Sequence, residues 1–467
     1  MKTTGNLLAV VLGAAWLLAG CAKRPVQSPS SWSLDQSAAS TQLKQFVTGQ
    51  ETQARSLAKQ DGSTLPADFD AFYQAARTGD WPAATNLYAR MSAGIRNASP
   101  RHGSWWLATM DAYGVYELFP PGDKYAVAYG TDIIQSIPAG SIYFGGTDAG
   151  RFVVTALMEA HADGKPFFAL SQNPLPDGTY LQYLRAMYGG KIHLLTDEDL
   201  QTSFQDFSTD LQRRVAHDQQ FPNEPRQLKP GENYGRDANG RFQVSGQMSV
   251  EGIKALLTKT IFDRNPDREF YLEESFPLDW MYPQLEPHGL IMKINRQPLP
   301  EMSDEIIQRD REYWTTCVTP LIGGWLKPDT TVKEVAAFAE KIQGQKDLRG
   351  FAGDPQFVQS ECWCQSYSKL RSSIGGLYAW RAQHAADAAE KKRMNDAADF
   401  AFRQAWALCP YSQETVYRYV NLLMSEGRIA NALLVAETAA KMPSLQGANG
   451  ASLRDLVTKL KQFQTVR

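Results

Sequence analysis

Seven residues, Gly145–Arg151, form the segment of this chain that is best suited to hold a ligand. They read Gly-Gly-Thr-Asp-Ala-Gly-Arg and follow an apolar run, Ser141–Phe144, that predicts a buried strand. A helix is expected to follow, so free amides at its start could hold an anion. The dinucleotide fingerprint and the Gly-Lys-Ser/Thr of a P-loop are both absent. Asp148 and Arg151 are the candidate ligand-binding side chains, and the alternative is a tight turn in which Asp148 caps the helix.

A second polar group follows the next expected strand, Phe167–Leu170. Asn173 and Asp177 would lie on the same sheet edge as Asp148, because the carboxyl ends of parallel strands meet there. Such residues could recognise sugar hydroxyls. Ordinary turn formation explains Asn and Asp equally well.

A third group combines carboxylates with aromatic side chains, as carbohydrate sites do. Its members are Glu273, Glu274, Asp279, Trp280, Tyr282 and His288. Adjacent residues of a strand point to opposite faces, so Glu273 and Glu274 are not expected to act as an acid/base pair. A solvated loop around a buried Trp is the alternative.

No other pattern predicts catalysis, a metal site or a cofactor. The six histidines show no metal-binding spacing, and Cys362-Trp-Cys364 is not Cys-x-x-Cys. The chain lacks a Gly-x-Ser-x-Gly elbow. We therefore expect no catalytic residue, no metal and no cofactor.

Cys21 is predicted to carry a lipid. It ends Leu-Ala-Gly-Cys after Lys2 and a short apolar run, a pattern that resembles the bacterial lipobox. Residues 1–20 are then the signal peptide and Cys21 is the first mature residue. An ordinary signal peptide with a chance Cys is the alternative. We expect a periplasmic protein anchored to a membrane, and Ala22, in place of a retention aspartate, favours the outer membrane.

Bulk composition agrees with an exported protein outside the nucleic-acid-binding class. Removal of residues 1–20 takes away Lys2 and no acid, so the formal charge changes from -2 to -3, without the basic face that nucleic acids need. No second apolar run is long enough to span a bilayer. Besides Cys21 the chain has four cysteines, for which both disulfide pairing and free thiols stay open: Cys317, Cys362, Cys364 and Cys409.

Strands and helices alternate between residues 125 and 215, which predicts a mostly parallel, Rossmann-like α/β sheet. Expected strands are 141–144, 167–170, 191–195, 269–272 and 289–294, and expected helices include 151–161, 180–188, 196–217 and 249–262. Phe204, Phe207 and Leu211 should face inward from the third of these helices. Residues 218–247 and 276–288 are expected to be loops.

The last hundred residues predict tetratricopeptide-like helices. Small residues and prolines recur at the spacing of that repeat, in one unit ending at Pro410 and a second ending at Pro443. The expected organisation is a tether at 21–60, a helical hairpin region at 61–118, an α/β domain at 119–300, a helical connector at 301–374 and the repeats at 375–467.

Two segments resemble the extracytoplasmic part of protein O-mannosyltransferase-like membrane proteins. In Ile137–Asp148, Gly145 and Asp148 match that family's Gly-Asp-Asn-Asp, whereas Gly146 and Thr147 depart from it. The stretches Asn265–Tyr271 and Leu285–Leu290 resemble a later family segment. The resemblance covers roughly residues 115–295 and implies a soluble domain followed by tetratricopeptide-like helices.

The resemblance does not carry transferase activity, because that family does its chemistry on a multi-span membrane half. It implies acceptor, glycan or partner binding. We therefore expect a non-catalytic, lipid-anchored envelope protein that binds a protein partner through its repeats or assists envelope glycosylation. The alternatives are a carbohydrate-binding protein or enzyme using the sheet-edge loops, and a domain that docks on a separate membrane transferase.

Overall fold

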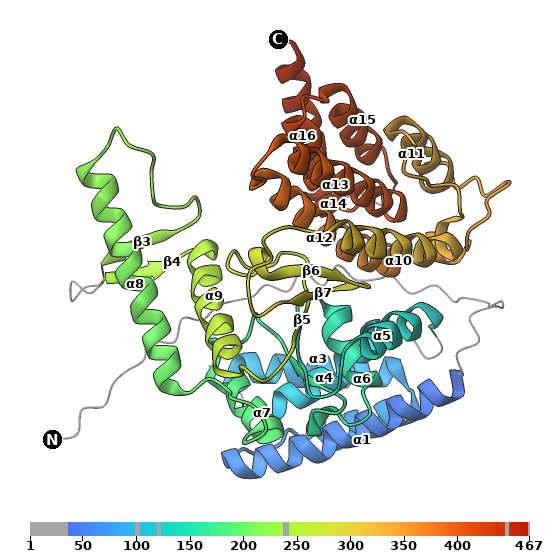
Figure 1. The fold of residues 1–467 in the computed structure, drawn as a ribbon. Coiled ribbons are helices and arrows are strands. Elements are labelled where there is room, and N and C mark those ends of the chain that lie inside the picture. The colour runs from blue at the N-terminus through green and yellow to red at the C-terminus, as the bar shows by residue number, and fades with distance from the viewer. Residues whose placement is uncertain (1–35, 99–102, 119–122, 237–241, 444–447, 466–467) are drawn as a thin grey trace.

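The computed structural model describes residues 36–98, 103–118, 123–236, 242–443 and 448–465 (Figure 1). Cys21 and the predicted signal peptide at 1–20 lie outside these residues. The described part is mostly helical, with a small five-stranded sheet at its centre. Among the described residues, no helix has both the length and the apolar character that crossing a bilayer requires.

Five helices precede the sheet: α1 (Gln36–Asp61), α2 (Phe69–Thr78), α3 (Trp81–Ala98), α4 (Trp105–Leu118) and α5 (Lys124–Ser136). The helical hairpin expected within 61–118 is present as α2 and α3. Gly79 separates them in the left-handed conformation, at φ 76°, which a residue without a side chain adopts at low cost.

Helix α1 corrects the tether expected at 21–60. Its Leu43, Val47, Ala54 and Leu57 are buried, and the helix packs along α4. These positions recur every three or four residues and form one apolar stripe. Most of the Ser, Gln and Thr residues between them are exposed, a composition typical of a linker, whereas Gln50 is buried.

The central sheet is mixed and small. Its strands are β1 (Ile142–Gly145), β2 (Phe168–Leu170), β5 (Phe270–Glu273), β6 (Leu285–His288) and β7 (Ile291–Ile294). The order is β2-β1-β5-β7-β6, with β1 parallel to both β2 and β5 and the remaining pairs antiparallel. The expected Rossmann-like, mostly parallel sheet is therefore replaced by three parallel strands extended by an antiparallel hairpin.

Two of the expected strands need correction. Residues 191–195 form no strand; a single bridge joins Gly189 to Ile192. Asn265 bonds to the backbone N–H and C=O of His193, so a side chain satisfies this segment in place of a neighbouring strand. Conversely, the loop expected at 276–288 contains β6, whose Pro287 is tolerated because β6 is an edge strand.

The helical segment in the connection from β1 to β2 ends earlier than the expected helix 151–161. A π-helical turn, η1 (Ala149–Val153), leads into α6 (Val154–Leu157), and the helical geometry stops at Met158. A 3-10 turn, η2 (His161–Asp163), follows. The later helices, α7 (Gly178–Tyr188), α8 (Asp197–Gln220) and α9 (Gln247–Arg264), occur close to their expected positions.

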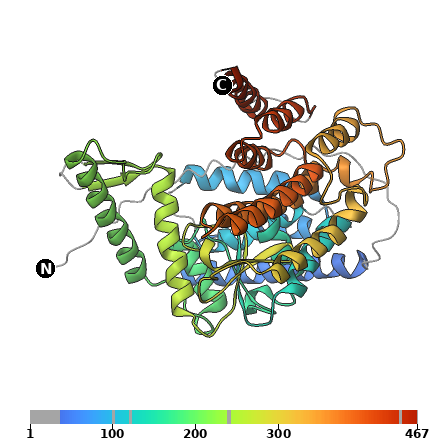
Figure 2. The same cartoon turned by 45° about the horizontal axis from the view of Figure 1, so that its top comes forward.

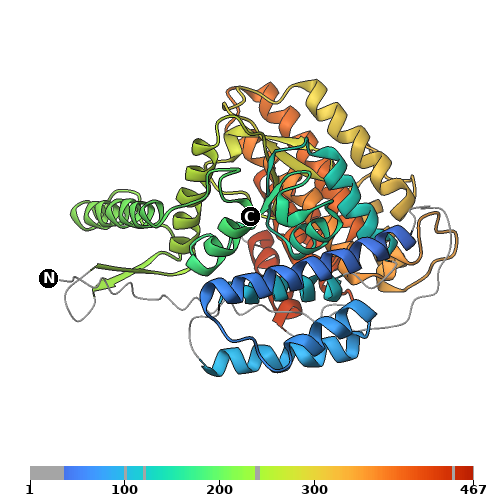
Figure 3. The same ribbon diagram turned by 90° about the horizontal axis from the view of Figure 1, so that it is seen from below.

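Helices α8 and α9 carry an arm that projects from the body (Figures 1 and 3). The segment expected to be a loop at 218–247 contains a two-stranded hairpin, β3 (Asn233–Arg236) and β4 (Phe242–Ser245). Phe207 and Leu211 pack into a small separate core there, whereas Phe204, expected to face inward, is 46% exposed.

The C-terminal part is helical throughout. Its helices are α10 (Asp304–Ile322), α11 (Val332–Ala339), α12 (Glu361–Gln383), α13 (Ala388–Leu408), α14 (Gln413–Ser425), α15 (Ile429–Ala440) and α16 (Ala448–Thr465). Two short turns, η4 (Glu340–Gly344) and η5 (Phe357–Gln359), lie between α11 and α12, and η3 (Tyr282–Gln284) precedes β6. Each helix from α12 to α16 contacts the next along the chain, as stacked helical repeats do. The domain boundary expected at 374/375 falls inside α12.

One hydrophobic core joins these parts. Its buried residues form one cluster that extends from Leu43 in α1 to Leu460 in α16. The arm, with its own small core, is outside this cluster. Helix α10 packs against β6 and α12 against β7, so helices of the C-terminal part cover the sheet (Figures 1 and 2). The helices therefore do not form a detached module: α12 lies directly on the sheet.

Candidate functional site

Strand β1 lies at the point where the sheet changes direction. The chain passes from β1 to β2 on one side, and from β2 it returns to β5 on the other side of β1. The loops after β1 and β5 therefore diverge and leave a crevice at their carboxyl ends. Open α/β sheets usually bind ligands at such a crevice.

The side chain of Glu273, the last residue of β5, fills this crevice. Its Oε2 accepts hydrogen bonds from the backbone N–H of Gly146, at 3.1 Å, and of Thr147, at 2.9 Å. Its Oε1 accepts from the Thr147 hydroxyl at 2.6 Å and from the Tyr129 hydroxyl at 2.9 Å. The amides that could hold an external anion are thus bonded to a carboxylate of the chain itself.

Glu273 is fully buried, and burial raises its pKa while the four hydrogen bonds act in the opposite direction. Two glycines make room for the acids. A Cβ on Gly150 would come within 1.8 Å of Glu273 Oε2, and one on Gly146 within 2.0 Å of Glu274 Oε2. The glycines of this loop therefore provide space for carboxylates that approach from β5.

Glu274 continues the acidic edge and meets the C-terminal helices. Burial, together with the negative charge of Glu273, raises the pKa of Glu274 to about 7, and Lys254 acts against this shift. The Ser373 hydroxyl of α12 donates to the Glu274 carbonyl at 2.7 Å. Arg418 of α14 donates to the Ser275 carbonyl, so two helices cover this edge of the sheet.

Of the four predicted ligand-binding residues, Arg151 is committed to an ion pair. Its guanidinium lies 2.6 Å from Asp111 of α4, and the two side chains are only 10% and 5% exposed. The Tyr183 hydroxyl donates to the other oxygen of Asp111 at 2.7 Å.

The other three predicted residues each have different surroundings. Asp148 is half-buried and does not cap the helical turn with its side chain; burial raises its pKa, while Lys369 and Arg151 lower it. Asn173 accepts a hydrogen bond from Lys254 at 2.9 Å. Asp177 caps α7 by accepting from the Thr179 N–H at 2.8 Å, which is the turn-forming alternative. The four residues do not converge on one pocket.

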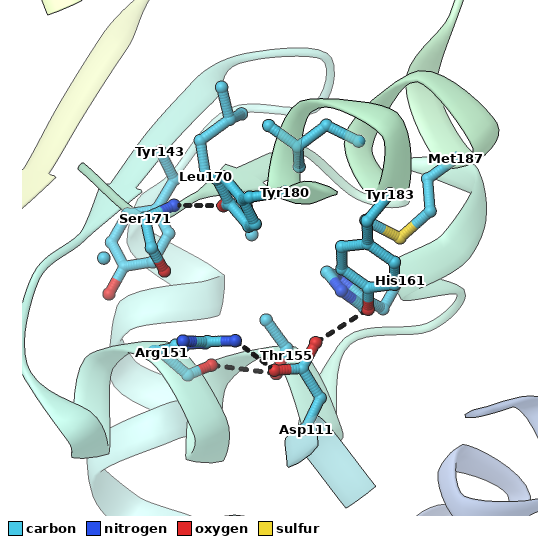
Figure 4. A pocket seen from close by; sticks show the side chains of 13 residues that line it. Asp111, Tyr143, Arg151, Thr155, His161, Leu170, Ser171, Tyr180, Tyr183 and Met187 are labelled. Atoms are coloured by element: carbon cyan, nitrogen blue, oxygen red, sulfur yellow. Dashed lines mark hydrogen bonds and ion pairs between the residues drawn. The ribbon is translucent and has the colours of Figure 1, made fainter. Parts of the chain in front are cut away.

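Arg151 does line a small cavity between η1, α7 and β2 (Figure 4). Its volume is about 20 Å³, enough for roughly one water molecule. The Tyr180 hydroxyl on its wall accepts from the Ser171 N–H at 2.7 Å. Burial lowers the pKa of His161 to about 4, so this ring is neutral. As it stands, the cavity is far too small for a sugar.

The sequence did not indicate the residues that complete this cavity. Asp111, Tyr180 and Tyr183 are spread over two helices and carry no motif. The one available signal was Asp111 itself, an acid within the apolar helix Trp105–Leu118, because a buried acid requires a partner.

The third predicted group is dispersed. Asp279 pairs with Lys229 at 3.0 Å, and the Trp280 ring N–H donates to Thr258 at 3.2 Å. Tyr282 stacks on Trp380, and the His288 ring bonds to the Ser136 carbonyl at 2.8 Å. None of these side chains faces Glu273 or Glu274 as an acid/base partner.

A larger groove lies among α12, α13 and α14. Its volume is about 360 Å³, within the range of ligand and peptide sites. Ala382, Phe402 and Leu422 form its buried apolar floor. Lys391 and Asn421 stand exposed on its rim, and within the described residues neither side chain has a hydrogen bond or ion pair.

Within the described part of the chain, no group of three or more His, Cys, Asp or Glu side chains is arranged to hold a metal ion. Comparison of the chain with protein-family models, with curated proteins and with solved structures finds no match. The function must therefore be argued from the geometry of this chain.

Proposed function

We propose that the chain is a non-catalytic, lipid-anchored protein of the cell envelope that binds a protein partner through helices α12–α14. The observation that carries the proposal is the groove, where an apolar floor is bordered by Lys391 and Asn421, whose side chains have no partner among the described residues. Helical repeats commonly use such concave surfaces for extended partners. We take the helices from α12 onward to be tetratricopeptide-like, on the spacing of their small residues.

The sheet edge supports the same proposal because its polar groups are bonded within the chain. Its anion-binding amides are bonded to Glu273, and three of the four predicted ligand residues, Arg151, Asn173 and Asp177, are bonded to separate partners. A carbohydrate enzyme would require these side chains to meet around a sugar-sized pocket. The lipid at Cys21, the periplasmic location and the outer membrane belong to this proposal, as does support of envelope glycosylation, which the resemblance to O-mannosyltransferase-like proteins favours.

The test is a crosslinking pull-down from native membranes with the tagged, lipidated chain. Lys391→Glu and Asn421→Arg change the groove rim, Asp148→Ala changes the sheet edge, and Lys459→Glu changes an exposed residue of α16 that pairs with Asp455. We expect one set of envelope proteins to be recovered with the wild type, Asp148→Ala and Lys459→Glu, and lost with the two groove variants. Loss with Asp148→Ala alone, with a glycoprotein or multi-span transferase among the wild-type partners, would overturn the proposal.

A further inference from the structure

Two buried cysteines lie at the same end of the helical pair α12 and α13. Cys364 lies in the first turn of α12, and Cys409 follows directly after the last residue of α13. Both side chains are fully buried. The two helices are joined by a short turn and pack antiparallel over their length.

The register of the two helices brings the cysteines to the same level. The Ser368 hydroxyl of α12 donates to the Ala405 carbonyl of α13 at 2.7 Å. Cys364 is one helical turn before Ser368, and Cys409 is one turn after Ala405. The Cys409 N–H still bonds to the Ala405 carbonyl, at 3.1 Å, so this last turn is closed. In an antiparallel pair both steps lead in the same direction, so the two cysteines lie at the same level of the pair.

Tyr411 provides a second, independent marker of their proximity. Its hydroxyl is hydrogen-bonded to the Cys409 thiol. Burial, followed by the charges of Cys409 and Cys364, raises the pKa of Tyr411. Burial is the main cause that raises the pKa of the Cys364 thiol, and the charge of Cys409 is the second cause. In the structure both residues are free thiols, and Cys364 donates to the Phe357 carbonyl at 3.1 Å.

The other two described cysteines are placed differently. Cys317 belongs to α10 and lies beside Asp132 and Tyr313. Cys362 is two residues before Cys364, about 200° around the same helix, and is only partly buried. Cys364 and Cys409 are therefore the pair that the fold brings together.

We propose that Cys364 and Cys409 form a disulfide when this chain folds in an oxidising compartment. The oxidant is a disulfide, either of an envelope oxidoreductase or of oxidised glutathione. The two thiols lose two protons and two electrons as the Cys364–Cys409 bond forms, and the disulfide of the oxidant is reduced to two thiols that take up the protons. The occurrence of the bond in cells rests on the proposed export, whereas the pairing itself does not.

The bond must form during folding. Thiolate is the attacking species, and the buried thiols of the folded chain are held protonated. Once formed, it closes a loop over residues 364–409 and fixes the end of the α12–α13 pair opposite the groove. It leaves Lys391 and Asn395, at the groove end of α13, unchanged.

The test uses the full chain with Cys21→Ser, which can be purified without lipid. The protein is unfolded, refolded in a buffer of reduced and oxidised glutathione, alkylated and digested without reduction. Mass spectrometry should find a linked peptide pair containing Cys364 and Cys409. The linked pair should persist in Cys317→Ser and Cys362→Ser and disappear in Cys409→Ser. Reduction should lower the midpoint of thermal unfolding by several degrees, except in Cys409→Ser.

Alkylated Cys364 and Cys409 in the refolded wild type, or a link from either one to Cys317 or Cys362, would overturn the pairing. The same digest of protein taken from native membranes separates the two proposals. A pair that is linked after refolding but reduced in cells would leave the pairing intact and contradict the proposed location outside the cytoplasm.

Discussion

The backbone N–H of Thr147 donates a 2.9 Å hydrogen bond to the carboxylate of Glu273, across the carboxyl ends of β1 and β5. This contact gives the glycine-rich loop a structural role. The loop holds an anion, as its sequence suggests, but the anion is a side chain of the same protein. The crevice where a ligand would bind in an open α/β sheet is closed from within.

The space around the carboxylates sets the first prediction. Gly150→Ala should destabilise the protein by about 2–3 kcal/mol, since its Cβ would overlap Glu273 and overpacking costs this much. Gly178→Ala is the matched control, because that position has nothing within 4 Å and lies in the first turn of α7. Urea unfolding of both variants checks the difference. Equal stabilities would show that the loop does not need its glycine.

The second prediction concerns the buried ion pair. Asp111→Asn should cost about 3 kcal/mol, because it leaves the Arg151 charge buried without a counter-ion. Arg151→Met should be similarly costly, but the double variant should lose much less than the sum of the two. A double-mutant cycle from urea unfolding measures this coupling. Additive losses would mean that the two side chains do not interact.

The third prediction is a pH dependence at Glu274. Its folded pKa of about 7 lies above the ordinary value of 4.5, so the folded protein holds a proton that the unfolded chain releases between these pH values. Stability should therefore fall as pH rises from 4.5 to 7, by at most about 3 kcal/mol from this group. In Glu274→Gln that decline should be absent. We would measure the free energy of unfolding of both proteins at pH 5 and pH 8; the same pH difference in both would contradict the assignment.

Much of the fold could be predicted where local chemistry decides. The Thr196 side chain accepts from the Asp199 N–H in a capping box, and α8 begins there as its sequence indicates. Thr331 and Glu334 form a second capping box, at the start of α11. The parallel strands β1 and β2 were evident because both of their faces are apolar.

Long-range pairing was the part that could not be predicted. Strand β6 contains Glu, Pro and His, and only its antiparallel partner β7 makes it a strand. The four hydrogen bonds of Glu273 come from residues that are 126 to 144 positions away in the chain. No local pattern distinguishes a carboxylate that fills a loop from one that faces solvent, so the sequence leaves Glu273 open between a carbohydrate site and a solvated loop.

Removal of the Glu273 carboxylate tests the central claim most directly. In Glu273→Ala, the Thr147 N–H and the hydroxyls of Thr147 and Tyr129 would face an empty space. The Gly146 N–H would keep its 2.7 Å bond to the backbone carbonyl of residue 273. We expect a loss of stability, and a saturable recovery of the thermal midpoint on addition of formate, which restores a carboxylate. Chloride at equal ionic strength is the control salt, and Glu274→Ala is the control variant. If Glu273→Ala does not fold, Glu273→Gln replaces it, with a smaller loss and no response to formate.

The account predicts that formate raises the midpoint of Glu273→Ala by several degrees and leaves the wild type unchanged. An equal rise in the wild type would contradict it, because the loop would then be free to take an external anion. Absence of any formate effect in a folded Glu273→Ala would also contradict it, because the loop amides would not depend on a carboxylate.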